Sequence, residues 1–135
     1  MQILLVDPDR AARSLVAHRL EEFFGHADIE QVSSGAEVMQ AIHSRRHDLV
    51  IVAHPLPVLG DTELTAVIKA RPYAPAIVVI TSGSALELDL QCRAAGVDLL
   101  LETRHLQPRL LAFLQRRFPK VWADGVTARR AASLR

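Results

Sequence analysis

The chain has 135 residues, half of them hydrophobic, and a formal net charge of +1 at pH 7. This length fits one domain that buries roughly two-thirds of its unfolded surface, and its apolar runs are far shorter than the roughly twenty residues of a membrane span. The first residues lack the basic segment of a signal peptide, and the single cysteine, Cys92, excludes an internal disulfide. We therefore expect a cytoplasmic protein, since unpaired cysteine is typical of a reducing compartment.

Five strands and five helices are expected to alternate along the chain. The expected strands are residues 2–6, about 29–33, 49–53, 76–81 and 97–102. The expected helices run from about Pro8 to Phe24, from Ser34 to about Ser44, from about Asp61 to the residues before Pro72, from Ser84 to Ala95, and from Pro108 to about Phe118. Such alternation predicts an α/β fold, a doubly wound parallel sheet with right-handed crossovers and helices on both faces.

Polar residues and prolines set the expected helix starts. Asp7 is predicted to cap the first helix with Pro8 at the first helical position, where proline gives up no useful hydrogen bond. Ser34 and Ser84 each stand three residues before a glutamate, which is the capping-box pattern. Asp61 is the expected cap of the third helix.

Charge is distributed unevenly along the chain. Residues 1–103 hold 8 Lys and Arg against 14 Asp and Glu, whereas residues 104–135 hold 8 against 1. We expect a domain over residues 1–118 and a basic, flexible tail or linker over residues 119–135.

The central strand, residues 49–53, has the most informative pattern in the sequence. It is a run of aliphatic residues that follows Asp48 and ends at Ala53, and Pro57 comes four residues after Ala53. Unbroken apolar runs are typical of strands that helices cover on both faces. With the opening strand that ends in Asp7 and with Thr81 after the fourth strand, this pattern resembles the receiver domain of bacterial two-component response regulators, over about residues 2–118. The resemblance implies a flavodoxin-like sheet with strand order 2-1-3-4-5.

The same resemblance implies a degenerate phosphorylation pocket. Active receivers hold Mg²⁺ between an acidic pair and an acceptor aspartate, with a hydroxyl residue and a lysine nearby. Here Asp7 and Thr81 match their positions, whereas Pro8, Ala53 and Thr103 stand in place of an acid, the acceptor and the lysine. Magnesium needs several hard oxygen ligands, and alanine takes up no phosphoryl group, so we expect no catalytic residue, no metal and no cofactor.

Three residues near the pocket have alternative interpretations. Asp9 is either a helix-start residue favoured by the helix dipole or part of a weak metal site. His54 is either a loop residue or a ligand, and Arg104 either a solvated side chain or an anion contact. An enzyme on this fold is disfavoured, because the chain has no glycine-rich phosphate loop and no nucleophile–base pair.

We therefore predict a phosphorylation-independent pseudo-receiver that acts through protein–protein contacts. The expected surface is built from the fourth helix, the fifth strand and the fifth helix, by analogy with the family. Its members are Leu99, Leu100, Leu101, Arg104, Arg109 and Arg116. It is expected to meet a protein partner or a second copy, and no membrane. The alternative is the input domain or remnant of a DNA-binding response regulator, although this chain alone has no helix-turn-helix.

Overall fold

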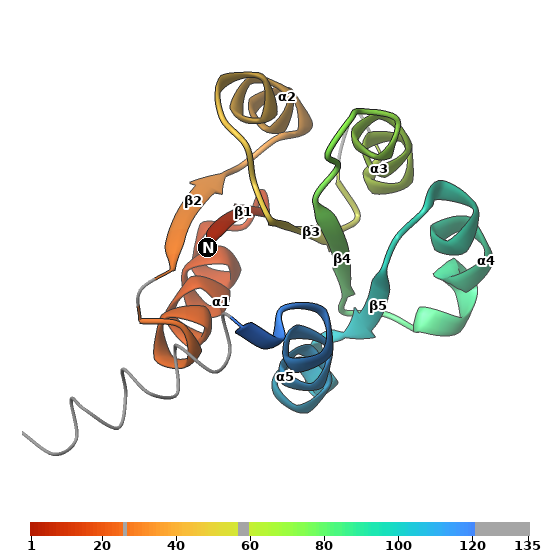
Figure 1. Ribbon diagram of the computed structural model, residues 1–135. Coiled ribbons are helices and arrows are strands. Elements are labelled where there is room, and N and C mark those ends of the chain that lie inside the picture. Colours follow the sequence, from red (N-terminus) through yellow and green to blue (C-terminus); the bar gives the residue numbers. More distant parts are fainter. Residues whose placement is uncertain (26, 57–59, 121–135) are drawn as a thin grey trace, which may run out of the picture.

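The computed structural model describes residues 1–25, 27–56 and 60–120. Five parallel strands form one sheet in the order β2-β1-β3-β4-β5, which confirms the expected α/β fold and strand order (Figure 1). The strands are β1 (Gln2–Val6), β2 (Asp28–Val32), β3 (Leu49–His54), β4 (Ala76–Thr81) and β5 (Leu99–Glu102). The helices are α1 (Arg10–Phe23), α2 (Gly35–Ser44), α3 (Asp61–Lys69), α4 (Ala85–Ala95) and α5 (Leu106–Arg117).

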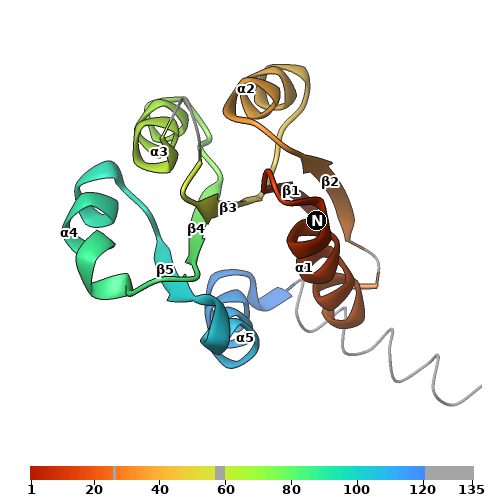
Figure 2. The same ribbon diagram turned by 180° about the vertical axis from the view of Figure 1, so that it is seen from behind.

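Helices cover both faces of the sheet. One core contains Leu20 of α1 and Leu114 of α5, packed on alternate strand residues such as Ile51. The other core contains Val38 of α2, Leu64 of α3 and Cys92 of α4, packed on the intervening strand residues. Figures 1 and 2 show α1 and α5 together on one face and α2, α3 and α4 on the other. Because β1, β3 and β4 are buried on both faces, their sequences show no polar alternation.

The first helix begins later than the sequence predicts. Asp9, not Asp7, is its N-cap, and the Asp9 carboxylate accepts the backbone N–H groups of Ala11 and Ala12. Asp7 instead accepts the N–H of Asp9 at 2.8 Å. Both aspartates flank Pro8, and the turn formed by Asp7 moves the helix start two residues along.

Three other boundaries also differ from those predicted. The fifth helix begins at Leu106 after a 3₁₀ turn at Thr103–His105, so Pro108 lies inside its first turn. Gly60 occupies the N-cap of α3, and Asp61 is its first helical residue. Strand β5 starts at Leu99, two residues after the predicted start.

Two serine caps are confirmed, in different forms. Ser34 Oγ accepts the N–H of Glu37, as in a capping box. Ser84 Oγ accepts the N–H of Leu86, one residue earlier than that pattern requires. Gly96 ends α4 in the left-handed conformation at φ 95°, which favours glycine.

Candidate functional site

The carboxyl ends of the strands gather at one edge of the sheet. In β3 and β4, Ala53 pairs with Ile80 and His54 with Thr81, while Asp7 follows β1 directly. In open parallel sheets this edge is where ligands bind. The structure therefore brings the predicted pocket positions into one region.

The two aspartates after β1 are committed to the backbone. Asp7 takes part in the turn with Asp9, and its carbonyl accepts a hydrogen bond from Arg13 at 2.7 Å. The Asp9 carboxylate is directed at the first amides of α1. The helix-start interpretation of Asp9 is thus confirmed, and Pro8 between them offers no ligand oxygen.

Ala53 borders a hollow of about 460 Å³ at the end of β3. Its side chain is half-buried, and Leu5, Ile51 and Ile80 supply apolar walls. Asp7, Pro8, His54 and Thr103 also line this hollow. The site is a largely apolar depression in which a single methyl group occupies the end of the central strand.

Thr81 and Thr103 each use their hydroxyl group in a hydrogen bond to the backbone. Thr81 is buried, and its hydroxyl accepts the N–H of Gly83 at 3.1 Å. The Thr103 hydroxyl donates to the carbonyl of Thr81 at 3.2 Å. This bond ties the end of β4 to the turn after β5 through a neutral side chain.

Arg104 turns toward a neighbouring carboxylate. Its guanidinium donates to Glu102 Oε1 at 2.9 and 3.3 Å. This hydrogen bond, together with the positive charge of Arg104, lowers the pKa of Glu102. Arg104 already pairs with a carboxylate of its own chain, which argues against the anion contact, one of its two interpretations.

The leucines of the predicted interaction surface are less exposed than expected. Strand β5 is the sheet edge, but Leu101 is fully buried in the core with α1 and α5, and Leu99 and Leu100 are half-buried. The prediction that all three leucines are displayed is therefore wrong. Arg109 and Arg116 are exposed on α5.

Two exposed leucines on α4 went unpredicted. Leu86 is 88% exposed and Leu90 is 81% exposed, one turn apart. Apolar residues fill much of α4 in the sequence, so spacing alone did not separate the outward leucines from the buried Cys92. Exposed apolar side chains grouped on one helix are typical of contact surfaces.

Among the described residues, no group of three or more His, Cys, Asp or Glu is placed to hold a metal ion. The described helices also include none long and apolar enough to cross a membrane. The predicted tail falls mostly on residues 121–135, outside the described residues, so its predicted flexibility stays a prediction.

Comparison with known proteins gives a family. Residues 3–115 match the model of the response regulator receiver domain. The chain belongs to this family. It is a receiver domain of signal transduction, with the CheY-like fold.

One curated relative matches this chain over part of its length. A protein-glutamate methylesterase/protein-glutamine glutaminase of Hahella chejuensis is 33% identical over 84 residues, which are 62% of this chain and 24% of that protein. This receiver therefore matches about a quarter of the length of that relative.

Two solved structures share the fold at low identity. The chemotaxis response regulator CheY4 of Vibrio cholerae is 23% identical, with a TM-score of 0.75 over 87% of this chain and 98% of that one. The receiver domain of the sensor histidine kinase PA1611 of Pseudomonas aeruginosa, solved with magnesium in its active-site cleft, is 24% identical, with a TM-score of 0.71 over 85% and 94%.

Proposed function

We propose that this receiver is a pseudo-receiver, which signals through protein contacts and does so without phosphorylation. The observation that carries the proposal is Ala53 at the end of β3, in the position that the resemblance assigns to the phospho-acceptor. Pro8 and Thr103 line the same hollow and take the places of a second acid and of the lysine. A receiver that lacks these groups has neither the nucleophile nor the charges that would hold Mg²⁺ and a phosphoryl group.

Phosphoryl transfer from a small donor tests this proposal directly. The chain is incubated with acetyl phosphate and Mg²⁺, alongside a receiver that retains its acceptor aspartate as the positive control. We expect the intact mass of this chain to stay unchanged while the control gains one phosphoryl group. A phosphoryl adduct on this chain would overturn the proposal. The proposal also assigns no enzymatic activity and no cofactor to the chain.

The proposed contact surface consists of α4, β5 and α5. Its support is the pair of exposed leucines on α4, Leu86 and Leu90, together with the exposed arginines Arg109 and Arg116 on α5. Arginine is enriched in protein interfaces relative to the rest of the protein surface. The occupant is a protein partner or a second copy of the chain.

Charge reversal distinguishes this surface from the rest of the molecule. Arg109→Glu combined with Arg116→Glu should weaken self-association or partner capture without changing the thermal midpoint by more than a few degrees. Arg10→Glu combined with Arg19→Glu, at exposed positions of α1, is the matched control. Loss of association in the control pair alone would place the surface elsewhere. The alternative, an input domain separated from a DNA-binding effector, stays a prediction.

A further inference from the structure

The hollow that Ala53 borders has the size and the position of a ligand site. Its volume of about 460 Å³ lies within the range of about 300–1,000 Å³ that is usual for small-molecule pockets. Its lining includes residues of both β1 and β3, which are neighbours in the sheet. From these two strands the sheet continues to β2 on one side and to β4 and β5 on the other. Open parallel sheets bind ligands where the strand order reverses in this way, outside the carboxyl ends of the strands.

Apolar side chains form most of the lining. Leu5, Ile51 and Ile80 are buried residues of β1, β3 and β4. Leu15 of α1 also lines the hollow, and 58% of its surface is exposed. A ligand with a hydrocarbon group would cover Leu15 and lie against the strand residues. Removing apolar surface from water favours such a ligand.

The titratable groups of the lining are acidic, apart from His54. Asp7 and Asp9 contribute two carboxylates, and the lining contains no lysine or arginine. Arg13 lies nearby, but its guanidinium donates to the backbone carbonyl of Asp7 and to the side-chain carbonyl of Gln31, not to a carboxylate. A site lined by one sign of charge attracts ligands of the opposite sign. The hollow therefore favours a cation over an anion.

Asp7 is the carboxylate best placed to bind a cationic group. Its Oδ1 accepts the N–H of Asp9 at 2.8 Å, and the hydrogen bonds of the described residues include no other to this carboxylate. An ionised carboxylate has about four acceptor positions on its two oxygens, so most of them stay unused. Asp9 is less suitable, because its Oδ1 already accepts two backbone amides of α1. A bond from an ammonium group to Asp7 would be charge-assisted and stronger than a neutral one.

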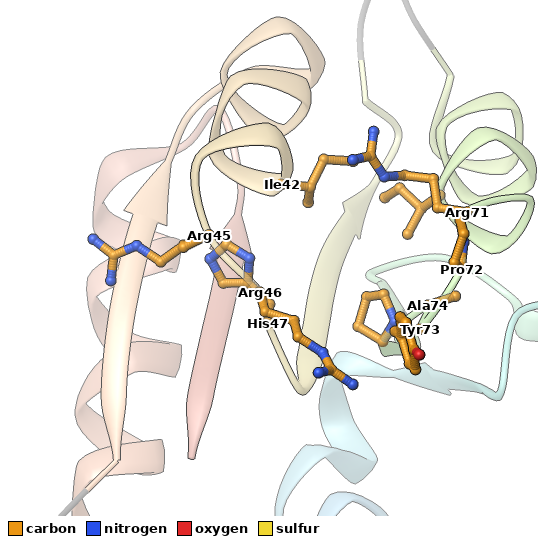
Figure 3. Close-up of a pocket in the computed structure, with 10 residues that line it drawn as sticks. Ile42, Arg45, Arg46, His47, Arg71, Pro72, Tyr73 and Ala74 are labelled. Atoms are coloured by element: carbon orange, nitrogen blue, oxygen red, sulfur yellow. The ribbon is translucent and has the colours of Figure 1, made fainter.

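The opposite end of the sheet carries positive side chains instead. A smaller hollow of about 180 Å³ lies there, between the segment after α2 and the segment after α3 (Figure 3). Its lining includes Arg45, Arg46 and Arg71, and no carboxylate. Figure 3 shows these three side chains pointing in different directions. The two hollows differ in the sign of their charge, so electrostatics directs a cationic ligand to the one at the carboxyl end.

We propose that the hollow at Ala53 binds a small organic amine, a monocation that carries a hydrocarbon group. Its ammonium group pairs with Asp7, and its hydrocarbon group lies against the apolar walls. The small side chain of Ala53 leaves room for this ligand at the end of the central strand. The amine can occupy the hollow only where no phosphoryl group is taken up, so this proposal rests on the proposed pseudo-receiver function.

Amide chemical-shift titration of the full chain at pH 7 tests the site with benzylamine, benzyl alcohol and benzoate. These probes have similar sizes and are a cation, a neutral molecule and an anion. We expect benzylamine to give saturable shifts in residues 5–9, 51–54 and 103–106, with a Kd about tenfold lower than that of benzyl alcohol, and benzoate to give none. The titration contains no phosphoryl donor, so its failure is distinct from a phosphoryl adduct in the acetyl phosphate assay, which would refute the pseudo-receiver function.

Two outcomes of this titration would overturn the proposal. No saturable benzylamine shift in these segments below about 10 mM would overturn the site, since a millimolar dissociation constant is already weak binding. Equal or tighter binding of benzyl alcohol or benzoate would overturn the assignment of a cationic ligand.

Asp7→Asn tests the ion pair, because it removes the charge and keeps an oxygen that can accept the N–H of Asp9. It should weaken benzylamine binding by about tenfold, which is the effect of losing about 1.4 kcal/mol, so that benzylamine and benzyl alcohol bind alike. Glu21→Gln is the matched control, at an exposed position in the last turn of α1. Equal weakening in the control would show a general charge effect and overturn the pairing with Asp7.

Ala53→Leu tests the position of the ligand, because the larger side chain fills part of the hollow. Both benzylamine and benzyl alcohol should bind at least tenfold more weakly to this variant. Unchanged affinity for both probes would place the ligand elsewhere and overturn the site. Asp7→Asn tests the site independently of any loss of stability in Ala53→Leu.

Discussion

Ala53→Asp would restore a carboxylate to the end of β3, and its energetic effect follows from the surroundings. The new side chain would enter a hollow with the apolar walls Leu5, Ile51 and Ile80, beside the carboxylate of Asp7. Partial burial and a like charge both disfavour the ionised form, so the pKa of the new carboxyl should rise above its unfolded value of about 3.9.

The size of this effect is modest because the hollow is open to solvent. We expect a rise of about one pKa unit, which corresponds to about 1.4 kcal/mol. At pH 7 the carboxyl is ionised in the unfolded chain and must also ionise in the less favourable folded site, so the folded state loses that free energy. The loss shrinks as the pH falls toward the unfolded pKa, and it vanishes below it. With a urea m-value of about 1–3 kcal/mol/M, the midpoint should fall by roughly 0.5–1.4 M at pH 7.

Urea unfolding of Ala53→Asp and Ala53→Asn isolates the charge, because the two side chains have nearly the same shape. The midpoint difference between them should be present at pH 7 and much smaller at pH 4. Adding Thr103→Lys should reduce the difference at pH 7, since Thr103 lines the same hollow. A difference that is the same at both pH values would refute the reasoning.

Phosphorylation of the repaired pocket follows the same logic. Ala53→Asp alone should gain no phosphoryl group from acetyl phosphate, because Asp7 and the new carboxylate make a poor magnesium site without a second acid. Adding Pro8→Asp and Thr103→Lys should give modest incorporation. Efficient phosphorylation of the single variant would show that the pocket needs less than we infer.

Three further variants test other parts of the structure. Gly96→Ala should lower the free energy of unfolding by about 1–2 kcal/mol in urea titrations, because φ at this position is 95°. Arg104→Gln should raise the pKa of Glu102 toward its ordinary value in an NMR titration. The stability that the lowered pKa provides at pH values above the ordinary pKa of glutamate should then be lost. Leu101→Ala should cost about 2–5 kcal/mol, whereas Leu90→Ala should stay within about 0.5 kcal/mol; equal costs would contradict their burial.

Much of the fold could be predicted because its apolar runs are compatible with few structures other than buried strands. The runs that became β1, β3 and β4 are buried on both faces, and such runs are typical of covered parallel strands. The strand order followed from the family resemblance, not from periodicity. Helix starts were harder: Asp7 and Asp9 are both good caps, and only the turn between them decides which one is used.

The residues that line the hollow at the end of β3 could be named from the sequence, and their roles stay predictions. The residue types at Ala53 and Thr103 limit the chemistry that this hollow can support, whatever the exact ends of the strands. Side-chain exposure on β5 and α4 depends on tertiary packing, which is why Leu101 was misplaced and Leu86 was missed. The small hollow between the segments after α2 and α3 had no signal in the sequence, because the residues that line it come from segments that meet only in the folded chain.

The charged side chains at the two ends of the sheet differ in whether they already have bonding partners. At the carboxyl end, the aspartates are bonded to nearby backbone, and Thr103 supplies no cation. At the amino end, Asp98 is held by Lys69 at 2.6 Å, and the acids of β2 are held by Arg45. The arginines that remain, Arg46 and Arg71, have no such partner in the described chain. These two guanidinium groups therefore lie at the end of the sheet opposite the hollow that Ala53 borders.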